Sequence, residues 1–228
     1  MPLRKERRRL VVAIDGPGGS GKSTVARGVA AALGAHYLDT GAMYRALTVK
    51  ALRAGVDPRD ARALARLTRQ TRITWRRDAR GRWQLLLDGE DVARAIRSPE
   101  TTRTVSTVSQ HSQVRRWMVR LQRHFARAGS VVVEGRDIGT VVFPRARHKF
   151  FLTASPAVRA RRRFRELRTE GVRTTLAAVL TALKRRDTLD SHRAVSPLIC
   201  AADAVRVDTS RRTVQQTVHT ILRHITVG

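Results

Sequence analysis

Residues 10–24 read LVVAIDGPGGSGKST, and this stretch decides how the rest of the chain is interpreted. Its first five residues form a short apolar run typical of a buried strand, and a helical pattern begins at Ser23. Between them, residues 16–23 match G-x-x-x-x-G-K-[S/T] without a gap, in the strand–loop–helix setting that this phosphate-binding pattern requires. A bare match arises by chance in about one chain in a hundred of this length. The stretch therefore predicts a loop that holds a purine nucleoside triphosphate with Mg²⁺.

The residue types of the loop suit phosphate and metal chemistry. Glycines let backbone N–H groups face phosphate oxygens without a Cβ clash, and the following helix directs its positive end at them. Lys22 adds a compact charge that can follow the transferred phosphoryl group, and the Ser23 hydroxyl can bind Mg²⁺. Asp15 and Glu134 end adjacent predicted strands, where they either hold water molecules of Mg²⁺ or orient the loop. The predicted ATP-binding residues are Gly16, Pro17, Gly18, Gly19, Ser20, Gly21, Lys22, Ser23 and Thr24.

The segments outside the loop alternate between strand and helix patterns, which favours an α/β fold with a parallel sheet. We expect a single domain, residues 1–228, with a five-stranded parallel sheet between two helical layers. One stretch departs from the alternation, because residues 73–77, a turn at 78–81 and residues 82–87 form the pattern of an antiparallel hairpin. The predicted strands are 10–14, 36–38, 130–134, 148–152 and 204–208, and the predicted helices are 23–33, 42–54, 113–128, 156–170, 174–186 and 213–225.

Composition narrows the possible classes of protein. The chain has 228 residues and one cysteine, Cys200, so it has no intrachain disulfide framework and no cysteine-rich zinc site. No apolar run reaches the roughly 18 residues that cross a bilayer, and the basic start lacks the features of a secretory signal. The seven histidines show no metal-ligand spacing such as H-E-x-x-H. These features indicate a soluble, cytoplasmic protein without contact to a membrane.

The net charge of +28 raises the question of a polyanionic partner. Aromatic residues make up only 4% of the chain and basic residues occur in every segment, so a dedicated nucleic-acid face is not indicated. Solvated charge is the simpler interpretation. A contact between nucleic acid and the basic tail, residues 1–9, is the alternative, although such a contact is not expected to be the function.

Four further motifs contain arginines and acids near predicted element ends. They read LDTGAMYR at 38–45, VEGRDIGTVVFP at 133–144, SPAVRARRR at 155–163 and KRRDTLDSHRAVSP at 184–197. Together with the phosphate loop and the hairpin, these motifs resemble the bacterial cytidylate kinases, a family of P-loop nucleoside monophosphate kinases. The resemblance extends from about Leu10 to His224. Two departures are the density of basic residues and His192, which stands where the family usually has a small polar residue.

The resemblance implies a reaction and a set of site residues. The γ-phosphoryl group of ATP passes to CMP or dCMP in a Mg²⁺-dependent in-line transfer within pyrimidine nucleotide metabolism, which yields ADP and CDP or dCDP. The implied regions are a monophosphate-binding insertion at about 68–108 and a lid at about 155–172. The implied substrate-binding residues are Thr40, the phosphate clamps Arg45 and Arg136, the cytosine neighbours Ser106, Arg115, Asp137 and Arg193, and the ribose and phosphate neighbours Arg186 and Asp190. The implied catalytic residues are Lys22, Arg136 and the lid arginines Arg159, Arg162 and Arg163.

The residues themselves favour the same chemistry, because transfer between phosphates needs positive charge and positioning more than a base. Structural alternatives stay open. Arg–Asp pairs such as Arg186 and Asp190 are commonly structural ion pairs, and Tyr44 and the apolar stripe of helix 113–128 fit a packed core. A kinase for another small acceptor, such as a different monophosphate or a shikimate-like acid, is a second hypothesis. A nucleic-acid-binding ATPase, suggested by the charge, is a third. We expect a monomer whose partners are small-molecule substrates.

Overall fold

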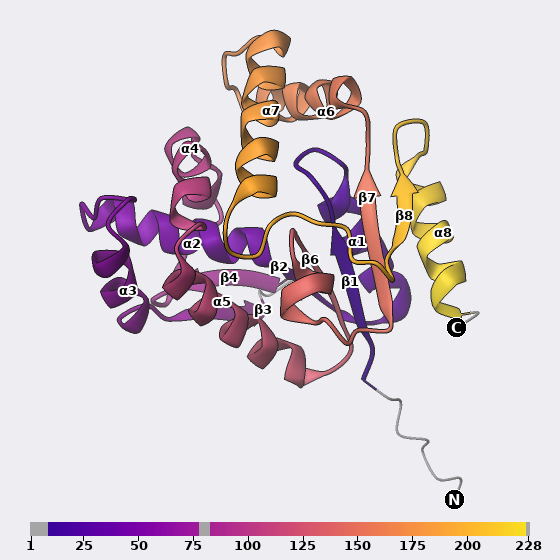
Figure 1. Ribbon diagram of the computed structural model, residues 1–228, viewed down its shortest axis with the longest axis horizontal. Coiled ribbons are helices and arrows are strands. Elements are labelled where there is room, and N and C mark those ends of the chain that lie inside the picture. Colours follow the sequence, from indigo (N-terminus) through magenta and orange to yellow (C-terminus); the bar gives the residue numbers. More distant parts are fainter. Residues whose placement is uncertain (1–8, 78–82, 227–228) are drawn as a thin grey trace, which may run out of the picture.

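The computed structural model describes residues 9–77 and 83–226, and these residues form a five-stranded parallel sheet with helices on both faces (Figure 1). The strand order is β2-β6-β1-β7-β8. The alternating pattern predicted a five-stranded parallel sheet, and this sheet is present. The elements are β1 Val11–Asp15, α1 Lys22–Leu33, β2 His36–Asp39, α2 Thr40–Arg53, α3 Ala61–Arg69, β3 Ile73–Arg77, β4 Trp83–Leu87, β5 Glu90–Asp91, η1 Ala95–Arg97, α4 Pro99–Val108, α5 Ser112–Phe125, η2 Ala126–Ala128, β6 Val131–Gly135, η3 Ile138–Val142, β7 His148–Thr153, α6 Pro156–Thr169, α7 Leu176–His192, β8 Val205–Asp208 and α8 Val214–Thr226.

Strand β1 lies at the centre of the sheet and supplies residues to two cores. It pairs in parallel with β6 and β7, and Val12, Ala13 and Ile14 are fully buried. Because side chains alternate across a strand, Val12 and Ile14 pack with α1 and α8, and Ala13 packs with α2 and α5 on the other face. Helices on both faces explain why this strand is a continuous apolar run. The three-layer α/β/α class expected from the sequence is confirmed.

Helix starts near the sheet are fixed by side chains of the expected type. Asp39, the last residue of β2, accepts a hydrogen bond from Ala42 N at 2.9 Å and so begins α2 directly. Ser155 caps α6, with Pro156 in its first turn, and Thr175 caps α7. The caps of α2 and α6 fix the first turns of these helices at the carboxyl edge of the sheet, where ligands bind in open α/β folds.

The antiparallel hairpin is present, and residues 78–82 of its turn lie outside the described residues. Strands β3 and β4 pair from Ile73↔Leu87 to Arg77↔Trp83, and β5 adds a third strand. Buried residues of β3 and β4 join the core under α2 and α5. The hairpin and helices α3 and α4 project to the side of the main sheet (Figure 1).

Two local structures differ from the sequence expectation. Helix α7 continues to His192 instead of ending near residue 186, so Arg186 and Asp190 lie one turn apart on a helix and not at a strand end. Residues 138–142 form a π-helical turn, η3, for which no element was predicted from the sequence. The apolar stripe of α5 is core as predicted, because Val114 and Met118 are fully buried. Within the described ranges, no helix is long and apolar enough to cross a membrane.

Candidate active site

The phosphate loop follows β1 and depends on glycine at several positions. Gly16, Gly19 and Gly21 have φ values of +145°, +75° and +86°, which side-chain-bearing residues rarely adopt. A Cβ on Gly16 would lie 2.1 Å from the carbonyl oxygen of Leu152 in the adjacent strand. The loop therefore packs directly against the end of β7, and α1 begins at Lys22 with its backbone N–H groups directed into the loop.

Lys22 is buried inside this loop. Its Nζ donates a hydrogen bond to the carbonyl oxygen of Pro17 at 2.7 Å, and the residue is 5% exposed. Burial and the positive charge of Arg136 lower the pKa of Lys22 to about 7. An anionic phosphate group in the loop would offset both effects, so the ammonium ion of Lys22 suits a bound polyphosphate.

Carboxylates at two adjacent strand ends, those of β1 and β6, lie near the first turn of α1. The two oxygens of Asp15 accept hydrogen bonds from Ile138 N and Gly139 N at 2.8 and 2.7 Å, and burial raises the pKa of Asp15 to about 6. Burial and the negative charge of Asp39 raise the pKa of Glu134, although Lys22 and hydrogen bonds with Tyr37 and Ser23 oppose this rise. Asp15 therefore holds the first turn of η3.

The residues present fit a hydrated Mg²⁺ ion. Ser23 and Glu134 adjoin each other and offer hard oxygen donors, which Mg²⁺ prefers together with several retained water molecules. Among the described residues no group of three His, Cys, Asp or Glu side chains could form a dedicated metal cage, as is usual for an ion held mainly by substrate phosphates. Asp15 is the poorer candidate, because both of its oxygens already bind backbone N–H groups.

A second group of charged side chains lies around Asp137, which follows β6. Arg115 of α5 forms a short ion pair with Asp137, and Arg193 Nη2 lies 3.9 Å from the other carboxylate oxygen. Arg115 and Asp137 are nearly fully buried, and the Arg115 guanidinium stands over the Tyr44 ring at 5.4 Å. Arg115 Nε and Arg193 Nη2 are buried without a hydrogen-bond partner in the described structure. Such donors are costly to bury alone and indicate a polar ligand.

Asp190 of α7 is the centre of a third group. Arg136 Nε donates to Asp190 at 2.8 Å, and Arg186 and Arg193 each lie 3.9 Å from it. Burial acts to raise the pKa of Asp190, but Arg136 and Arg186 outweigh it and hold the pKa below its usual value. Burial and the charge of Arg136 lower the pKa of Arg186 to about 9, and its Nε has no partner in the described structure. Positive charge exceeds negative charge here, as an anion site requires.

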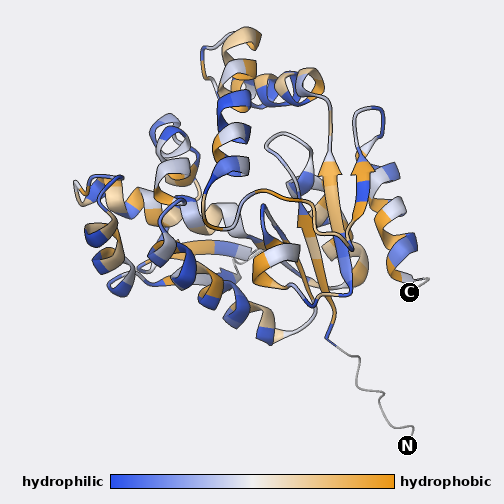
Figure 2. Cartoon of the chain, viewed as in Figure 1, coloured by the Kyte–Doolittle hydropathy of each residue, from blue (hydrophilic) through white to orange (hydrophobic). Residues whose placement is uncertain are grey.

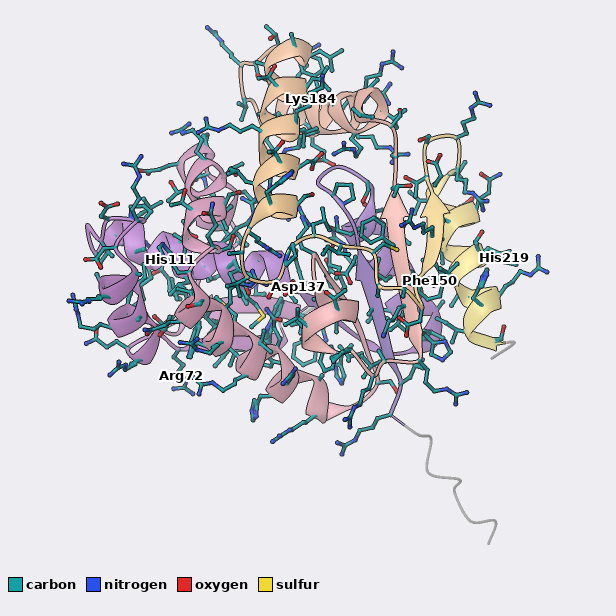
Figure 3. All side chains as sticks on the ribbon, in the orientation of Figure 1. Arg72, His111, Asp137, Phe150, Lys184 and His219 are labelled. Atoms are coloured by element: carbon teal, nitrogen blue, oxygen red, sulfur yellow. The ribbon has the colours of Figure 1, made fainter. Side chains whose placement is uncertain are left out.

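Arg136 connects this group to the phosphate loop. A Cβ on Gly18 would lie 3.7 Å from Arg136 Nη2, and Arg136 is a main cause of the lowered pKa of Lys22. The phosphate loop and the arginines around Asp190 are therefore neighbours, although they are more than 110 residues apart in the chain. In Figure 3, Asp137 lies at the centre of the molecule between α7 and the carboxyl edge of the sheet.

Three other predicted substrate residues have different surroundings. Arg45 donates to the carbonyl oxygen of Ile96 and the hydroxyl of Thr102, and burial lowers its pKa to about 10. Arg163 and Arg136 add to this lowering, so Arg45 belongs to the same positive field. The Thr40 hydroxyl donates to the Glu134 carbonyl oxygen at 2.7 Å and fixes the edge of β6. Ser106 is half-buried on α4.

The lid arginines already have partners in this state. Arg159 is buried, donates to the Gly18 carbonyl oxygen at 3.1 Å and pairs with Asp187 at 2.6 Å. Arg162 donates to the hydroxyl and carbonyl oxygens of Thr209 at 2.9 and 2.7 Å. Arg163 is the most accessible of the three and pairs with Glu166 at 3.0 Å.

Sequence reasoning missed Thr209 and Asp187. Thr209 follows β8, is buried, and its hydroxyl lies 3.0 Å from the carbonyl oxygens of both Ser20 and Thr153. It thus links Arg162 to the phosphate loop. No motif marks Thr209, and only its place just after a strand at the carboxyl edge of the sheet could have drawn attention to it. Asp187 lies within a quoted motif, but its partner Arg159 is on a different helix, and a linear pattern does not show that contact.

The central strand that enters a glycine loop with a buried lysine, beside an arginine-rich acceptor site, defines a P-loop phosphotransferase. A family model described as cytidylate kinase matches residues 12–227. A cytidylate kinase from Symbiobacterium thermophilum is 49% identical over 217 residues, which cover 95% of this chain and 96% of that protein. One from Mycobacterium leprae is 53% identical over 203 residues and covers 89% of each chain. The chain belongs to the cytidylate kinase family, as the sequence motifs indicated.

Solved structures show a more distant likeness. Shikimate kinase from Acinetobacter baumannii in complex with shikimate has a TM-score of 0.45 and 17% identity, covering 96% of this chain and 94% of that chain. A gluconokinase from Sinorhizobium meliloti has a TM-score of 0.47 and 16% identity, covering 96% of this chain and 94% of that chain.

Proposed function

We propose that this chain transfers the γ-phosphoryl group of ATP to CMP or dCMP, with ADP and CDP or dCDP as products. Membership of the cytidylate kinase family supports the substrates. The observation that carries the proposal is the position of Arg136, which adjoins Gly18 of the phosphate loop and pairs with Asp190 of the acceptor group. A guanidinium at that junction can contact both the transferred phosphoryl group and the acceptor phosphate.

The proposed mechanism relies on charge and positioning. The acceptor is a phosphate oxygen that is already largely ionised near neutral pH, so no general base is needed. The loop N–H groups and Lys22 hold the donor phosphates, and Arg45 and Arg136 hold the acceptor phosphate in line with them. Ser23, and Glu134 through a water molecule, would hold Mg²⁺, which would supply further neutralisation of the donor phosphate oxygens. Arg163 completes the positive field when the lid closes, while Arg159 and Arg162 fix the lid against the loop.

In this proposal, the buried side chains around Asp137 recognise the cytosine base. Cytosine presents an amino donor beside the N3 and O2 acceptors. The Asp137 carboxylate can accept from the amino group, and the unpartnered N–H groups of Arg115 and Arg193 can donate to N3 and O2. Ser106 on α4 and the ribose neighbours Arg186 and Asp190 complete the proposed acceptor site.

A coupled assay of ADP release tests this proposal. The enzyme is given ATP and Mg²⁺ with CMP, dCMP, UMP, AMP or shikimate, and nucleoside diphosphate is identified in the products. We expect turnover with CMP or dCMP, and a loss of about 10³-fold in kcat for Lys22→Ala. Lys184→Ala, which removes an exposed lysine of α7, is the matched control and keeps full activity. Turnover with shikimate alone, or ADP release that depends on RNA without a phosphorylated product, would contradict the proposal.

A further inference from the structure

Helix α5 carries a line of arginines on its exposed side. Arg116, Arg120 and Arg123 follow one another at intervals of four and three residues, which places them on one helix face, and Arg127 continues the line in η2. All four are exposed, and α5 contains no acidic residue. Figure 2 shows strongly hydrophilic residues recurring along this helix. We call these four residues the arginine track.

The arginine track is not neutralised by the protein itself. Within residues 9–77 and 83–226, none of its four members forms an ion pair. The neighbouring Arg115 points inward to Asp137, and half-buried Arg163 on α6 is balanced by Glu166. Four like charges at such short intervals repel one another and are best satisfied by a polyanion with regularly spaced charges.

The track leads into a pocket at the end of the sheet opposite the phosphate loop. The pocket has a volume of about 550 Å³ and lies where β1 and β7 begin, at the lower end of the sheet in Figure 1. Arg123 belongs both to the track and to the pocket, and its guanidinium is fixed by the carbonyl oxygens of Val141 and Val142 at 2.9 and 2.8 Å. The pocket rim also contains Arg9, Arg145, Arg147 and His148.

The lining of the pocket is largely apolar and includes the ring of Phe143. Leu10, Val142, Phe143 and Pro144 line it, and Phe143 is half-buried. A flat base can stack on such a ring while its phosphates contact the arginines of the rim, and base stacking is the sequence-tolerant part of single-strand recognition. An apolar floor beneath a positive rim favours this partner over a bilayer surface, which needs apolar side chains that protrude.

We propose that the arginine track and this pocket form a binding surface for single-stranded nucleic acid. The phosphate backbone follows Arg116, Arg120, Arg123 and Arg127, and one base enters the pocket against Phe143. The surface lies at the amino ends of the strands, whereas the candidate active site lies at their carboxyl ends, so both can be occupied together. The high net charge of the chain would add a general attraction, which the experiment must separate from this specific surface.

The test measures fluorescence anisotropy of a labelled 16-nucleotide oligouridylate RNA with the full chain. The active site is first saturated with CMP and a non-hydrolysable ATP analogue, because its arginines also attract phosphate. The track variant changes two residues of the arginine track and one of the pocket rim, Arg116→Gln, Arg120→Gln and Arg145→Gln. The matched control is Arg59→Gln, Arg66→Gln and Arg69→Gln, which removes the same number of exposed charges from the region of α3. Phe143→Leu removes the ring and keeps an apolar side chain.

We expect the track variant to bind RNA at least tenfold more weakly and the control to change less than twofold, with kcat for CMP unchanged in both. The slope of log affinity against log salt should shrink by about 2 in the track variant, because three phosphate contacts to a single strand are lost. Phe143→Leu should weaken binding at least threefold. Equal losses in both triple variants would overturn the proposal, as would no effect of Phe143→Leu. The proposal would also be overturned if phosphatidylglycerol vesicles displaced the labelled RNA as well as unlabelled RNA does at the same concentration of negative charge.

Discussion

Positive side chains outnumber carboxylates around Asp137 and Asp190, and this imbalance determines what the site can bind. Arg115, Arg136, Arg186 and Arg193 share these two acids, and the first two form short or direct pairs with them. Removing one partner of a buried pair leaves an uncompensated charge, which costs about 3–5 kcal/mol. The same residues therefore bear on both stability and ligand recognition, and tests at this scale must separate the two.

Asp137→Asn tests the reading of the base. An amide can donate a hydrogen bond to O4 of uracil, whereas the carboxylate of Asp137 faces that acceptor without a bond. We expect the ratio of kcat/KM for CMP to that for UMP to fall at least tenfold, chiefly through loss of CMP activity. Because the ratio does not depend on the fraction of folded enzyme, it is insensitive to any loss of stability from unpaired Arg115. An unchanged ratio would assign discrimination to Arg193 or Ser106, and Asp203→Asn on the surface serves as the control.

The lowered pKa of Lys22 leads to a test of proton linkage. In the free enzyme this pKa is about 7, because burial and Arg136 outweigh the acids Glu134 and Asp15. Bound triphosphate raises the pKa, so binding takes up about half a proton at pH 7, close to one at pH 8 and almost none at pH 6. Calorimetry of Mg²⁺–ATP binding in buffers of different ionisation enthalpy measures this uptake. Lys22→Arg, which stays charged throughout, should show none. Equal proton uptake by the wild type and by Lys22→Arg would show that Lys22 is not the group that takes up the proton.

Residue types in the loop could be predicted from sequence, because their chemistry and spacing are local. Lys22 and the glycines lie within eight consecutive positions, and a single pattern contains them all. The partner of Asp15 could not be predicted, because its carboxylate binds backbone N–H groups of η3, which is a property of the folded backbone. The residue type alone could not decide whether Asp15 holds water molecules of Mg²⁺ or orients the loop.

At the scale of elements, the lid and the phosphate loop are connected through β8. Arg162 of α6 binds Thr209, and the Thr209 hydroxyl has one proton to donate to either Ser20 O or Thr153 O, both 3.0 Å away. Thr209 N also donates to Thr153 O at 2.8 Å, which keeps the backbone in place without the hydroxyl. One buried side chain therefore connects α6 to the phosphate loop.

Thr209→Val tests this connection, because it keeps the shape of the side chain and removes the hydroxyl. We expect KM for ATP to rise about tenfold with a smaller fall in kcat, since the loss of one buried hydrogen bond costs about 1–2 kcal/mol. Thr209→Ser should restore most of the affinity. The CMP KM should stay within twofold in both variants, because the acceptor group does not contact Thr209. A fall in kcat for both substrates without rescue by serine would indicate general destabilisation instead.

The alternation of elements could be predicted from sequence, because buried parallel strands and amphipathic helices give different periodicities. The end of α7 was predicted too early, since residues 184–192 are mostly polar and lack an apolar stripe. This part of the helix projects Arg186 and Asp190 toward Arg136, so its polar character reflects the site and not the end of an element. Polar helical turns at a ligand site are poorly predicted by patterns that detect a core.

At the scale of the whole molecule, a net charge of +28 acts on folding as well as on binding. Like charges spread over a small domain repel one another and oppose the compact state. The sequence predicted this charge but not its distribution. Some arginines, such as Arg159 and Arg136, are balanced by acids of α7, whereas the arginine track of α5 is not. Which arginine is paired depends on contacts between distant elements, and composition cannot reveal it.

Self-repulsion predicts that salt stabilises the fold. Between 20 and 300 mM NaCl the screening length falls below the spacing of most exposed charges, so we expect the Tm of the free enzyme to rise by about 4 °C. A variant that combines the track and control substitutions, Arg59, Arg66, Arg69, Arg116, Arg120 and Arg145 each to Gln, removes six exposed charges and retains every arginine of the candidate active site. This variant should have a higher Tm than the wild type at 20 mM NaCl and a weaker dependence on salt. Differential scanning calorimetry decides between two causes. If the salt effect came from chloride bound among Arg136, Arg186 and Arg193, the variant would show the full wild-type shift, and the repulsion argument would be wrong.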